Sequence, residues 1–513
     1  MSSFQIWNKE MKIQAQIITI TILTTLFISC STNTPYATSI PKQKFRRCTS
    51  QEAAFQIDNL LNDAPTQMGW WGIKVQYVNT GEVIYERNAT KMFSPASNVK
   101  LFTTAAALCL LGPEYRYETD FVTNGTIENG ILKGDLIIRG SGDPTWDERF
   151  HTDKYDSIMV HFVDLLKAQG ITRINGDIIG DDNIFDDIPL GDGWMWDDER
   201  DSSSAQLSGL SFRRNYIDYK LTPNYSNIGS PVIIESSPQT SYVNLRNDLT
   251  TVSGETDSDW SYGRNRETND HWFEGSYSTQ AGVKERFLTI HNPTLFTVHV
   301  LKEHLMERGI LVDGNPMDAD DLADSINYKQ TKILFTFVSN PMSDIVIKTN
   351  HPSQNFIAET LVKTMDKEFG GEGSSKEGMK VQMALFDSLG IDIENLYLRD
   401  GSGLSRYDLV SPNNIASLLQ VMWNHEYHSY YVDSFPIAGV IGTIQKRMLG
   451  SSAVGNVHAK SGNMTNVSCL SGYAWTESDE PIIFSIMANN YMIGNSKVKP
   501  IQDKIAIILS DME

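Results

Sequence analysis

One short motif in the chain places a serine and a lysine at a spacing that suits nucleophilic catalysis. It is Ser97-Asn98-Val99-Lys100. Residues three apart on a helix share a face, so the Lys100 amine can reach the Ser97 hydroxyl. Serine is a weak nucleophile unless a nearby base takes its proton. Lysine is such a base only when neutral, so its pKa must fall from about 10.4 towards neutrality. Burial or a second nearby cation lowers it in that direction.

The same spacing also occurs at residues 39–42 (Ser-Ile-Pro-Lys) and 496–499 (Ser-Lys-Val-Lys). An isolated match is more often a helix-capping serine with a surface lysine than a catalytic pair. The copy at 39–42 contains a proline, and the copy at 496–499 precedes Pro500 in a turn rich in Gly and Asn. Only the copy at Ser97 opens a strongly apolar segment, which predicts a helix over 97–110.

A second motif, Lys460-Ser461-Gly462, is the only Lys-[Ser/Thr]-Gly in the chain. It ends a short strand-like run at 456–459. On an edge strand it offers a cation, a hydroxyl and a glycine that lets a substrate backbone approach closely. Taken alone, it also fits an ordinary strand end followed by a turn.

A third motif, Ser-x-Asn, begins at several serines. They are Ser31, Ser325, Ser353, Ser411 and Ser461. Ser353-Gln354-Asn355 is favoured because it lies on a loop between two helical segments, where side chains can project into a cleft. Ser411-Pro412-Asn413 has instead the pattern of a helix cap with proline in the first turn.

In this order, Ser-x-x-Lys, Ser-x-Asn and Lys-[Ser/Thr]-Gly are the signature of penicillin-binding proteins and class A β-lactamases. Five further short runs match one family of these proteins, at residues 94–100, 134–136, 140–144, 400–406 and 436–439. With them, the chain after about residue 50 resembles the D-Ala-D-Ala carboxypeptidase/endopeptidase family, the class C low-molecular-mass penicillin-binding proteins. Ser461 stands where the family commonly has Thr, and the hydroxyl is kept.

The resemblance implies a serine peptidase that acts on peptidoglycan stem peptides and binds β-lactam antibiotics. It cleaves the D-Ala-D-Ala bond, or the D-Ala–diamino acid cross-link, through an acyl-enzyme at Ser97. Lys100 takes the proton of Ser97. Ser353 relays it to the leaving amine, and Asn355 orients Lys100 and the substrate amide. Lys460 repels the Lys100 charge and so keeps that amine partly neutral.

The resemblance also implies how the substrate is held. Lys460 and Ser461 bind its terminal carboxylate, beside Gly462. The oxyanion lies between the backbone N–H groups of Ser97 and Asn463, because fixed donors must face the developing charge. Asp143 is expected at the rim of the site, holding a cationic side chain of the stem peptide. Its alternative role is turn formation.

Two other functions remain as alternatives. Class A β-lactamases carry a deacylating Glu between the second and third motifs. Glu394 is the nearest candidate, but its spacing is wrong, and the large insertion disfavours a compact lactamase. The other alternative is a non-catalytic lipoprotein that binds wall peptides or β-lactams. Intact Ser97, Lys100 and Lys460 argue against it.

The elements that position these residues predict an α+β fold. Strand-like segments at 73–78, 83–87, 467–475 and 481–488 predict an antiparallel sheet flanked by helices, as in a serine β-lactamase/transpeptidase-like domain. Val75, Phe484 and the strand of Lys460 are expected in this sheet. A large, mostly-β insertion rich in Asp, Gly, Ser and Asn interrupts the domain.

The 513 residues predict about two to four domains. The expected order is a signal peptide, a tether, a first transpeptidase-like part, inserted β-rich subdomains and a second transpeptidase-like part. Their bounds are 1–30, 31–48, 49–115, 116–325 and 326–513. The apolar run at 17–28 is too short for a comfortable membrane span. Cys30 follows it and predicts a periplasmic lipoprotein held to a membrane by a lipid anchor. An ordinary cleaved signal is the alternative.

The amino-acid composition restricts the possible ligands and binding partners. A net charge of −20 would repel nucleic acid. The four cysteines form no CxxC and no Cys/His cluster, so no zinc site is indicated. An acidic cluster lacks the spacing of an EF-hand loop and predicts a solvated surface. Its members are Asp181, Asp182, Asp186, Asp187, Asp197 and Asp198. No metal and no cofactor are expected.

Overall fold

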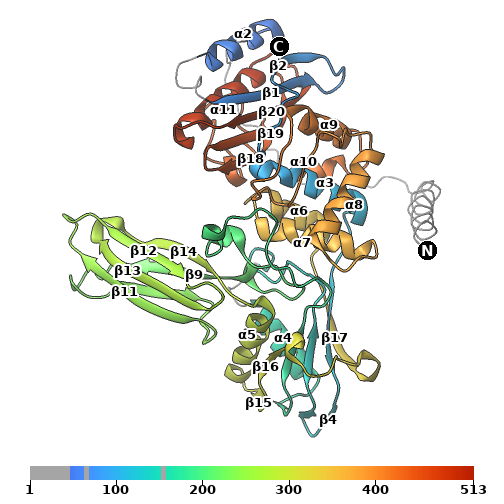
Figure 1. The fold of residues 1–513 in the computed structure, drawn as a ribbon, viewed down its shortest axis with the longest axis vertical. Coiled ribbons are helices and arrows are strands. Elements are labelled where there is room, and N and C mark those ends of the chain that lie inside the picture. Colours follow the sequence, from blue (N-terminus) through green and yellow to red (C-terminus); the bar gives the residue numbers. More distant parts are fainter. Residues whose placement is uncertain (1–46, 63–68, 152–156) are drawn as a thin grey trace. The chain divides into compact units, whose positions relative to one another are not determined.

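The computed structural model describes residues 47–62, 69–151 and 157–513. Its central feature is a five-stranded antiparallel sheet of order β18-β19-β20-β1-β2 (Figure 1). The strands are β1 (Trp70–Tyr77), β2 (Val83–Arg87), β18 (His458–Met464), β19 (Val467–Trp475) and β20 (Pro481–Asn489). Val75 pairs with Phe484, and Lys460 lies in β18, as the sequence predicts.

Both faces of this sheet are covered, which explains why its middle strands β19 and β20 are almost entirely buried. All nine residues of β20 are buried. Alternate residues of β20 point to opposite faces. Phe484 packs with helices α2 (Ser50–Leu61) and α11 (Asn495–Ser510). Ile483 packs in the other cluster, with α3 (Val99–Leu111) and α9 (Pro412–Trp423). A sheet between helical layers confirms the predicted α+β class.

Helix α3 carries the first motif into the interior. It begins at Val99, two residues later than predicted, because a 3-10 turn at Ala96–Asn98 precedes it. Residues 99–108 are all buried. The helix ends before Gly112, whose φ of 87° favours glycine and whose N–H donates to the Leu108 carbonyl. The remaining helices of this region are α6 (Met342–Asn350), α7 (Asn355–Glu368), α8 (Ser375–Ser388) and α10 (His428–Asp433).

The strands between α3 and α6 form four other sheets. The largest has the order β16-β8-β6-β3-β17, and the others are β15-β7-β5-β4, β10-β9-β14 and β11-β13-β12. Two helices pack among them, α4 (Ser157–Ala168) and α5 (Pro293–Glu307). The strands are β3 (Glu118–Thr123), β4 (Thr126–Glu128), β5 (Ile131–Lys133), β6 (Leu136–Arg139), β7 (Arg173–Ile174), β8 (Ile178–Asp181), β9 (Tyr216–Thr222), β10 (Ile233–Ser237), β11 (Asn244–Val252), β12 (Asp259–Arg264), β13 (Asp270–Ser278), β14 (Lys284–Thr289), β15 (Leu311–Val312), β16 (Pro316–Asp318) and β17 (Lys332–Val338).

Strand β17 bears on the expected boundary of the insertion at residues 325 and 326. It pairs antiparallel with β3 along its whole length, from Lys332 opposite Thr123 to Val338 opposite Glu118. The alternating pattern at 332–338 predicted the strand, but local sequence did not indicate which strand it pairs with. We therefore propose that the insertion extends to about residue 338, with the second part of the transpeptidase-like domain starting before α6.

The N-terminal features expected from the sequence lie outside the described residues. These are the signal peptide at 1–30, Cys30 and all but the last two residues of the tether at 31–48. Within the described ranges, none of the helices combines the length and apolarity needed to cross a membrane.

Candidate active site

The 3-10 turn before α3 brings Ser97 and Lys100 together. Lys100 is fully buried, and its Nζ lies 3.2 Å from Ser97 Oγ. It also donates to Asn355 Oδ1 at 2.7 Å and to the Ser402 carbonyl at 2.6 Å. These three acceptors match the three donors of an ammonium group. Loss of one proton would leave a lone pair able to accept the Ser97 proton.

Burial lowers the pKa of Lys100 to about 8, and the charges of Asp400, Glu359 and Asp408 oppose this shift. A pKa of about 8 leaves roughly one amine in ten neutral at pH 7. The environment of Lys100 therefore supplies an accessible base without a metal or cofactor.

Ser353 and Asn355 reach the site from the turn between α6 and α7. Ser353 has a φ of 61°, and Asn355 is the first residue of α7. The Asn355 amide donates to the Ser203 carbonyl at 2.9 Å, which directs its oxygen to Lys100. Among the Ser-x-Asn copies, Ser411 instead caps α9 by accepting from the Asn414 N–H.

Lys460 lies on β18, at the edge of the central sheet. It is fully buried and donates to Ser353 Oγ and to the Ser461 carbonyl, each at 2.8 Å. Burial, followed by the charge of Lys100, holds the pKa of Lys460 well below its usual value. The main cause of the lowered Lys100 pKa is burial, and an added contribution from the charge of Lys460 stays a prediction.

Gly462 lets β18 approach the backbone of the proposed nucleophile. A Cβ at this position would lie 2.6 Å from the Pro95 carbonyl oxygen and 3.0 Å from the Ser97 nitrogen. Any larger residue would push the edge strand away. Ser461, one residue earlier, donates its hydroxyl proton to Thr443 Oγ1 at 2.8 Å.

A cavity of about 280 Å³ opens beside these groups. Its lining combines the three motifs with residues that the sequence analysis did not select. The lining residues are Ser97, Ser353, Thr443, Arg447, Ser461, Asn463 and Lys499. Lys100 and Lys460 are fully buried behind the hydroxyls of Ser97 and Ser353.

Buried acids that were not among the predicted site residues support Lys100. Glu359 on α7 accepts from the Gly401 and Ser402 N–H groups at 3.0 and 2.7 Å, which fixes the Ser402 carbonyl facing Lys100. Asp400 accepts from the N–H groups of Gly403 and Ser405 at 2.6 and 2.7 Å. The run at 400–406 signalled this turn. Glu359 carried no signal, because it stands in an unremarkable helical pattern.

Glycine at position 403 allows the same turn to pack on the nucleophile. Its φ is 82°, and a Cβ there would collide with the Ala96 carbonyl oxygen. Burial and the charge of Asp400 raise the pKa of Glu359 to about 8. The pKa of Asp408 is also raised, first by burial and then by Asp400. Glu359 and Asp408 therefore hold their protons more tightly than exposed carboxyls do.

Thr443, Arg447 and Lys499 were also missed. Thr443 belongs to a 3-10 turn at Gly442–Ile444, and Arg447 follows it. Lys499 comes from α11 and belongs to the Ser-x-x-Lys copy at 496–499 that local sequence disfavoured. No local pattern signalled that these three residues would meet Ser97.

Asp143 does not occupy the expected rim position. Its side chain is only 5% exposed, and its Oδ1 accepts from the Thr145 N–H at 2.8 Å. Burial raises its pKa to about 7. Because it is buried and does not line the cavity with Ser97, its observed role is the turn formation that the sequence allowed as the alternative.

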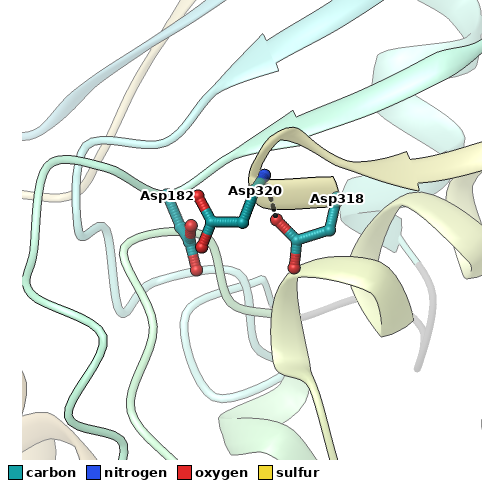
Figure 2. A group of neighbouring side chains, drawn as sticks. All are labelled: Asp182, Asp318 and Asp320. Atoms are coloured by element: carbon teal, nitrogen blue, oxygen red, sulfur yellow. Dashed lines mark hydrogen bonds between the residues drawn. The ribbon is translucent and has the colours of Figure 1, made fainter. Parts of the chain in front are cut away.

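The acidic cluster is only partly the solvated surface that was expected. Asp181 is buried and accepts from the Tyr328 hydroxyl, and Asp186 pairs with buried Lys363. Asp182 instead lies with Asp318 and Asp320, with one carboxylate oxygen of each within 4.8 Å of the others (Figure 2).

Hydrogen bonds within the chain serve all three of these acids, since Asp320 also accepts from the Asn183 amide at 3.3 Å. Asp182 accepts from the hydroxyls of Ser208 and Thr294, and Asp318 accepts from the Asn292 amide at 2.8 Å. Burial, followed by the charge of Asp182, raises the pKa of Asp318 to about 6. The group is thus stabilised by internal donors and by reduced ionisation of Asp318.

Residues 53–512 match the D-Ala-D-Ala carboxypeptidase 3 (S13) family. The D-alanyl-D-alanine carboxypeptidase of Actinomadura sp. (strain R39) is 31% identical over 468 residues, which covers 89% of this chain and 84% of the relative. The D-alanyl-D-alanine carboxypeptidase DacB of Haemophilus influenzae is 27% identical, over 83% of this chain and 87% of the relative.

Solved structures give the same relationship. The crystal structure of penicillin binding protein 4 (dacB) from Haemophilus influenzae matches with a TM-score of 0.73 and 26% identity, covering 85% of this chain and 94% of that chain. A structure of the same protein complexed with a novel β-lactam matches with a TM-score of 0.69 and 25% identity, covering 88% and 97%.

Proposed function

The chain belongs to the D-Ala-D-Ala carboxypeptidase 3 (S13) family, and we propose that it is a penicillin-binding serine peptidase that cleaves the D-Ala-D-Ala bond of peptidoglycan stem peptides. The observation that carries the proposal is the buried Lys100 amine, which contacts both Ser97 Oγ and Asn355 Oδ1. This contact joins two motifs that are more than 250 residues apart in sequence.

In the proposed acylation step, neutral Lys100 accepts the Ser97 proton while Ser97 Oγ attacks the penultimate D-Ala carbonyl. The 3.2 Å separation permits direct transfer. The remaining contacts, to Asn355 and the Ser402 carbonyl, hold the amine in place and stabilise the ammonium that forms.

The tetrahedral intermediate needs donors aimed at its oxyanion. We assign this role to the backbone N–H groups of Ser97 and Asn463. The close approach that Gly462 allows between β18 and the Ser97 nitrogen supports the assignment. Asn463 lines the same cavity as Ser97.

Departure of the terminal D-Ala requires a proton on its amine. Ser353 is the proposed relay, because its Oγ accepts from Lys460 at 2.8 Å and lines the cavity with Ser97. Lys460 can replace the proton that Ser353 donates. Water then attacks the acyl-enzyme with the same groups acting in reverse, which releases the shortened stem peptide.

The alternative of a class A β-lactamase is not favoured. Glu394, the nearest candidate for a deacylating Glu in the sequence, is exposed and does not line the cavity. Its N–H donates to Asp392 in a local turn. Slow hydrolysis of the penicilloyl-enzyme is therefore expected.

Mass spectrometry of the purified protein incubated with muropeptides tests the function. Loss of one D-Ala per stem peptide is expected from uncross-linked substrates. Conversion of cross-linked muropeptide dimers to monomers would show that the enzyme also cleaves the cross-link. Wild-type protein that releases neither product, yet is acylated by penicillin, would instead support the non-catalytic binding alternative.

An extracytoplasmic location follows from a cell-wall substrate. The finer proposal is a periplasmic lipoprotein, supported by the short apolar run at 17–28 and by Cys30 directly after it. Stable anchoring needs more than one acyl chain, which a lipidated N-terminal cysteine supplies. Cys30→Ser should move the protein from the membrane fraction to the soluble fraction, whereas unchanged fractionation would exclude the lipid anchor.

A further inference from the structure

We propose that Arg149, in the insertion, is a positioning residue for the turn that carries Ser353 and Asn355. This inference rests on the proposed function and concerns how these two side chains are kept in place. Arg149 Nη1 donates to Gln354 Oε1 at 2.6 Å. Gln354 lies between Ser353 and Asn355, so a hydrogen bond from the insertion holds the middle of the Ser-x-Asn motif.

The Ser-x-Asn turn has a backbone conformation that needs support from its surroundings. Ser353 has a φ of 61°, in the left-handed region that residues other than glycine rarely adopt. Such a conformation persists only where neighbouring contacts favour it. Two backbone hydrogen bonds tie the turn to the end of α6, through the carbonyls of Thr349 and Asn350. Arg149 adds a contact from outside the turn.

Both buried lysines of the site donate to this turn. Lys460 Nζ lies 2.8 Å from Ser353 Oγ, and Lys100 Nζ lies 2.7 Å from Asn355 Oδ1. A displaced turn would therefore weaken both hydrogen bonds at once. Displacements of about 1 Å are enough to lower catalytic rates strongly. Arg149 does not line the cavity with Ser97, so it would act on the reaction only through the turn.

The loop that carries Arg149 is fixed to the insertion by ion pairs. Asp147 and Arg214 are both almost fully buried and pair with each other. Glu148 pairs with Arg214 and with Arg213. Asp147 Oδ1 also accepts from the Arg149 N–H at 2.8 Å. The backbone of Arg149 therefore cannot move without disturbing these pairs.

The same loop joins two hydrophobic cores. Trp146 packs in the core of the insertion, where it contacts the rings of Phe121 and Phe162. Phe150 packs against the other core, which contains residues of α3 and α7. Because the loop is held at both ends, it presents Arg149 to the start of α7 from a defined position.

The chemistry of the contact suits a lasting link. The Arg149 guanidinium is charged and the Gln354 amide oxygen is neutral, so the hydrogen bond is charge-assisted. Gln354 is only 9% exposed, which limits competition from water for its oxygen. Neither group titrates near neutral pH, so the contact does not depend on pH there.

The test follows penicillin acylation by stopped flow and separates the dissociation constant of the first complex from the acylation rate constant. Arg149→Met removes the donors and should lower the rate constant by about 10- to 100-fold. The dissociation constant should change by less than about 3-fold, because Arg149 does not line the cavity. Arg149→Lys keeps a charged donor and should stay within about 3-fold of the wild-type rate. Arg246→Met, at an exposed arginine of the same insertion, is the matched control and should change neither constant.

Gln354→Met keeps the proposal testable if Arg149→Met fails to fold. It removes the acceptor and should cause the same loss, and the double variant should be no slower than either single variant. Losses that multiply in the double variant, an unchanged rate constant in either single variant, or Arg149→Lys as slow as Arg149→Met would overturn the positioning role. Wild-type protein that penicillin does not acylate would instead refute the proposed function, so the two failures are distinguishable.

Discussion

Two segments of the molecule have the same Ser-x-x-Lys spacing near the start of a helix, yet they differ in chemistry. In the first, Lys100 is fully buried, contacts Ser97 at 3.2 Å, and has a pKa lowered to about 8. In the second, Ser496 is exposed and Lys499 is only partly buried, next to Arg447. The first segment has the properties of a nucleophile and base, and the second supplies a cation to the same cavity.

The difference shows that the Ser-x-x-Lys spacing only places the serine and lysine side by side. Burial and contacts with residues distant in sequence make the pair reactive. Lys100 receives Asn355 from 255 residues away and the Ser402 carbonyl from 302 residues away. At Lys499 the nearby charges are Arg447, which lowers its pKa, and Asp503, which raises it. Each prediction below exchanges or removes one of these features.

The largest expected difference between the two segments appears when Ser97 or Ser496 is replaced by alanine. Ser97→Ala should abolish covalent labelling by penicillin, because Ser97 is the hydroxyl beside the proposed base Lys100, whereas Ser353 beside Lys460 is the proposed proton relay. Ser496→Ala should label at the wild-type rate. Intact-protein mass spectrometry after penicillin treatment measures both. Labelling that persists in Ser97→Ala would show that Ser97 is not the nucleophile.

The next effect concerns the two lysines. Lys100→Gln should lower the acylation rate constant by about 10²- to 10⁴-fold, the usual contribution of a general base. Lys499→Gln should cost only about 3- to 10-fold with penicillin, since a partly exposed charge contributes less. Stopped-flow acylation kinetics distinguish the two variants. Equal effects would mean that burial does not separate their roles.

A smaller effect is expected at Glu359, which fixes the Ser402 carbonyl. In Glu359→Gln the amide can accept from only one of the two N–H groups that the carboxylate serves. The free energy of unfolding should fall by about 1–3 kcal/mol, measured by denaturant titration. Full wild-type stability would show that the turn at 400–405 does not depend on this acid.

The same variant should also shift the pH profile. The Glu359 charge raises the pKa of Lys100, so its removal lowers that pKa. Because the pKa of Glu359 is itself about 8, this charge is present mainly over the upper part of the acidic limb, and the shift should be small. The acidic limb of acylation, expected near pH 8 in wild type, should therefore move to lower pH. Acylation rates measured between pH 5 and about 10 test this shift. A limb that moves upward would contradict the electrostatic assignment.

The smallest expected shift is that of Lys460→Gln. Burial is the leading cause of the lowered Lys100 pKa, so the loss of Lys460 should change the position of the acidic limb very little. The rate should fall through loss of the contact to Ser353, while the limb stays within about 0.3 pH units. An upward shift would restore Lys460 as a determinant of the Lys100 pKa.

Local pattern was sufficient for much of this protein. Residues three apart near a helix start are neighbours, so Ser97 and Lys100 meet without help from the rest of the chain. Apolar runs predicted β1, β19 and β20. The order of the three motifs indicated the family to which the chain belongs, and the loop position of Ser353 selected the copy that reaches the site.

Only the tertiary structure decided which distant groups surround that pair. Glu359, Arg447 and Lys499 stand in ordinary local patterns and gain their roles from packing. Asp143 has a suggestive sequence but is buried in a turn. The physical reason is that helix and strand geometry acts over a few residues, whereas burial, and with it the pKa of Lys100, depends on segments hundreds of residues apart.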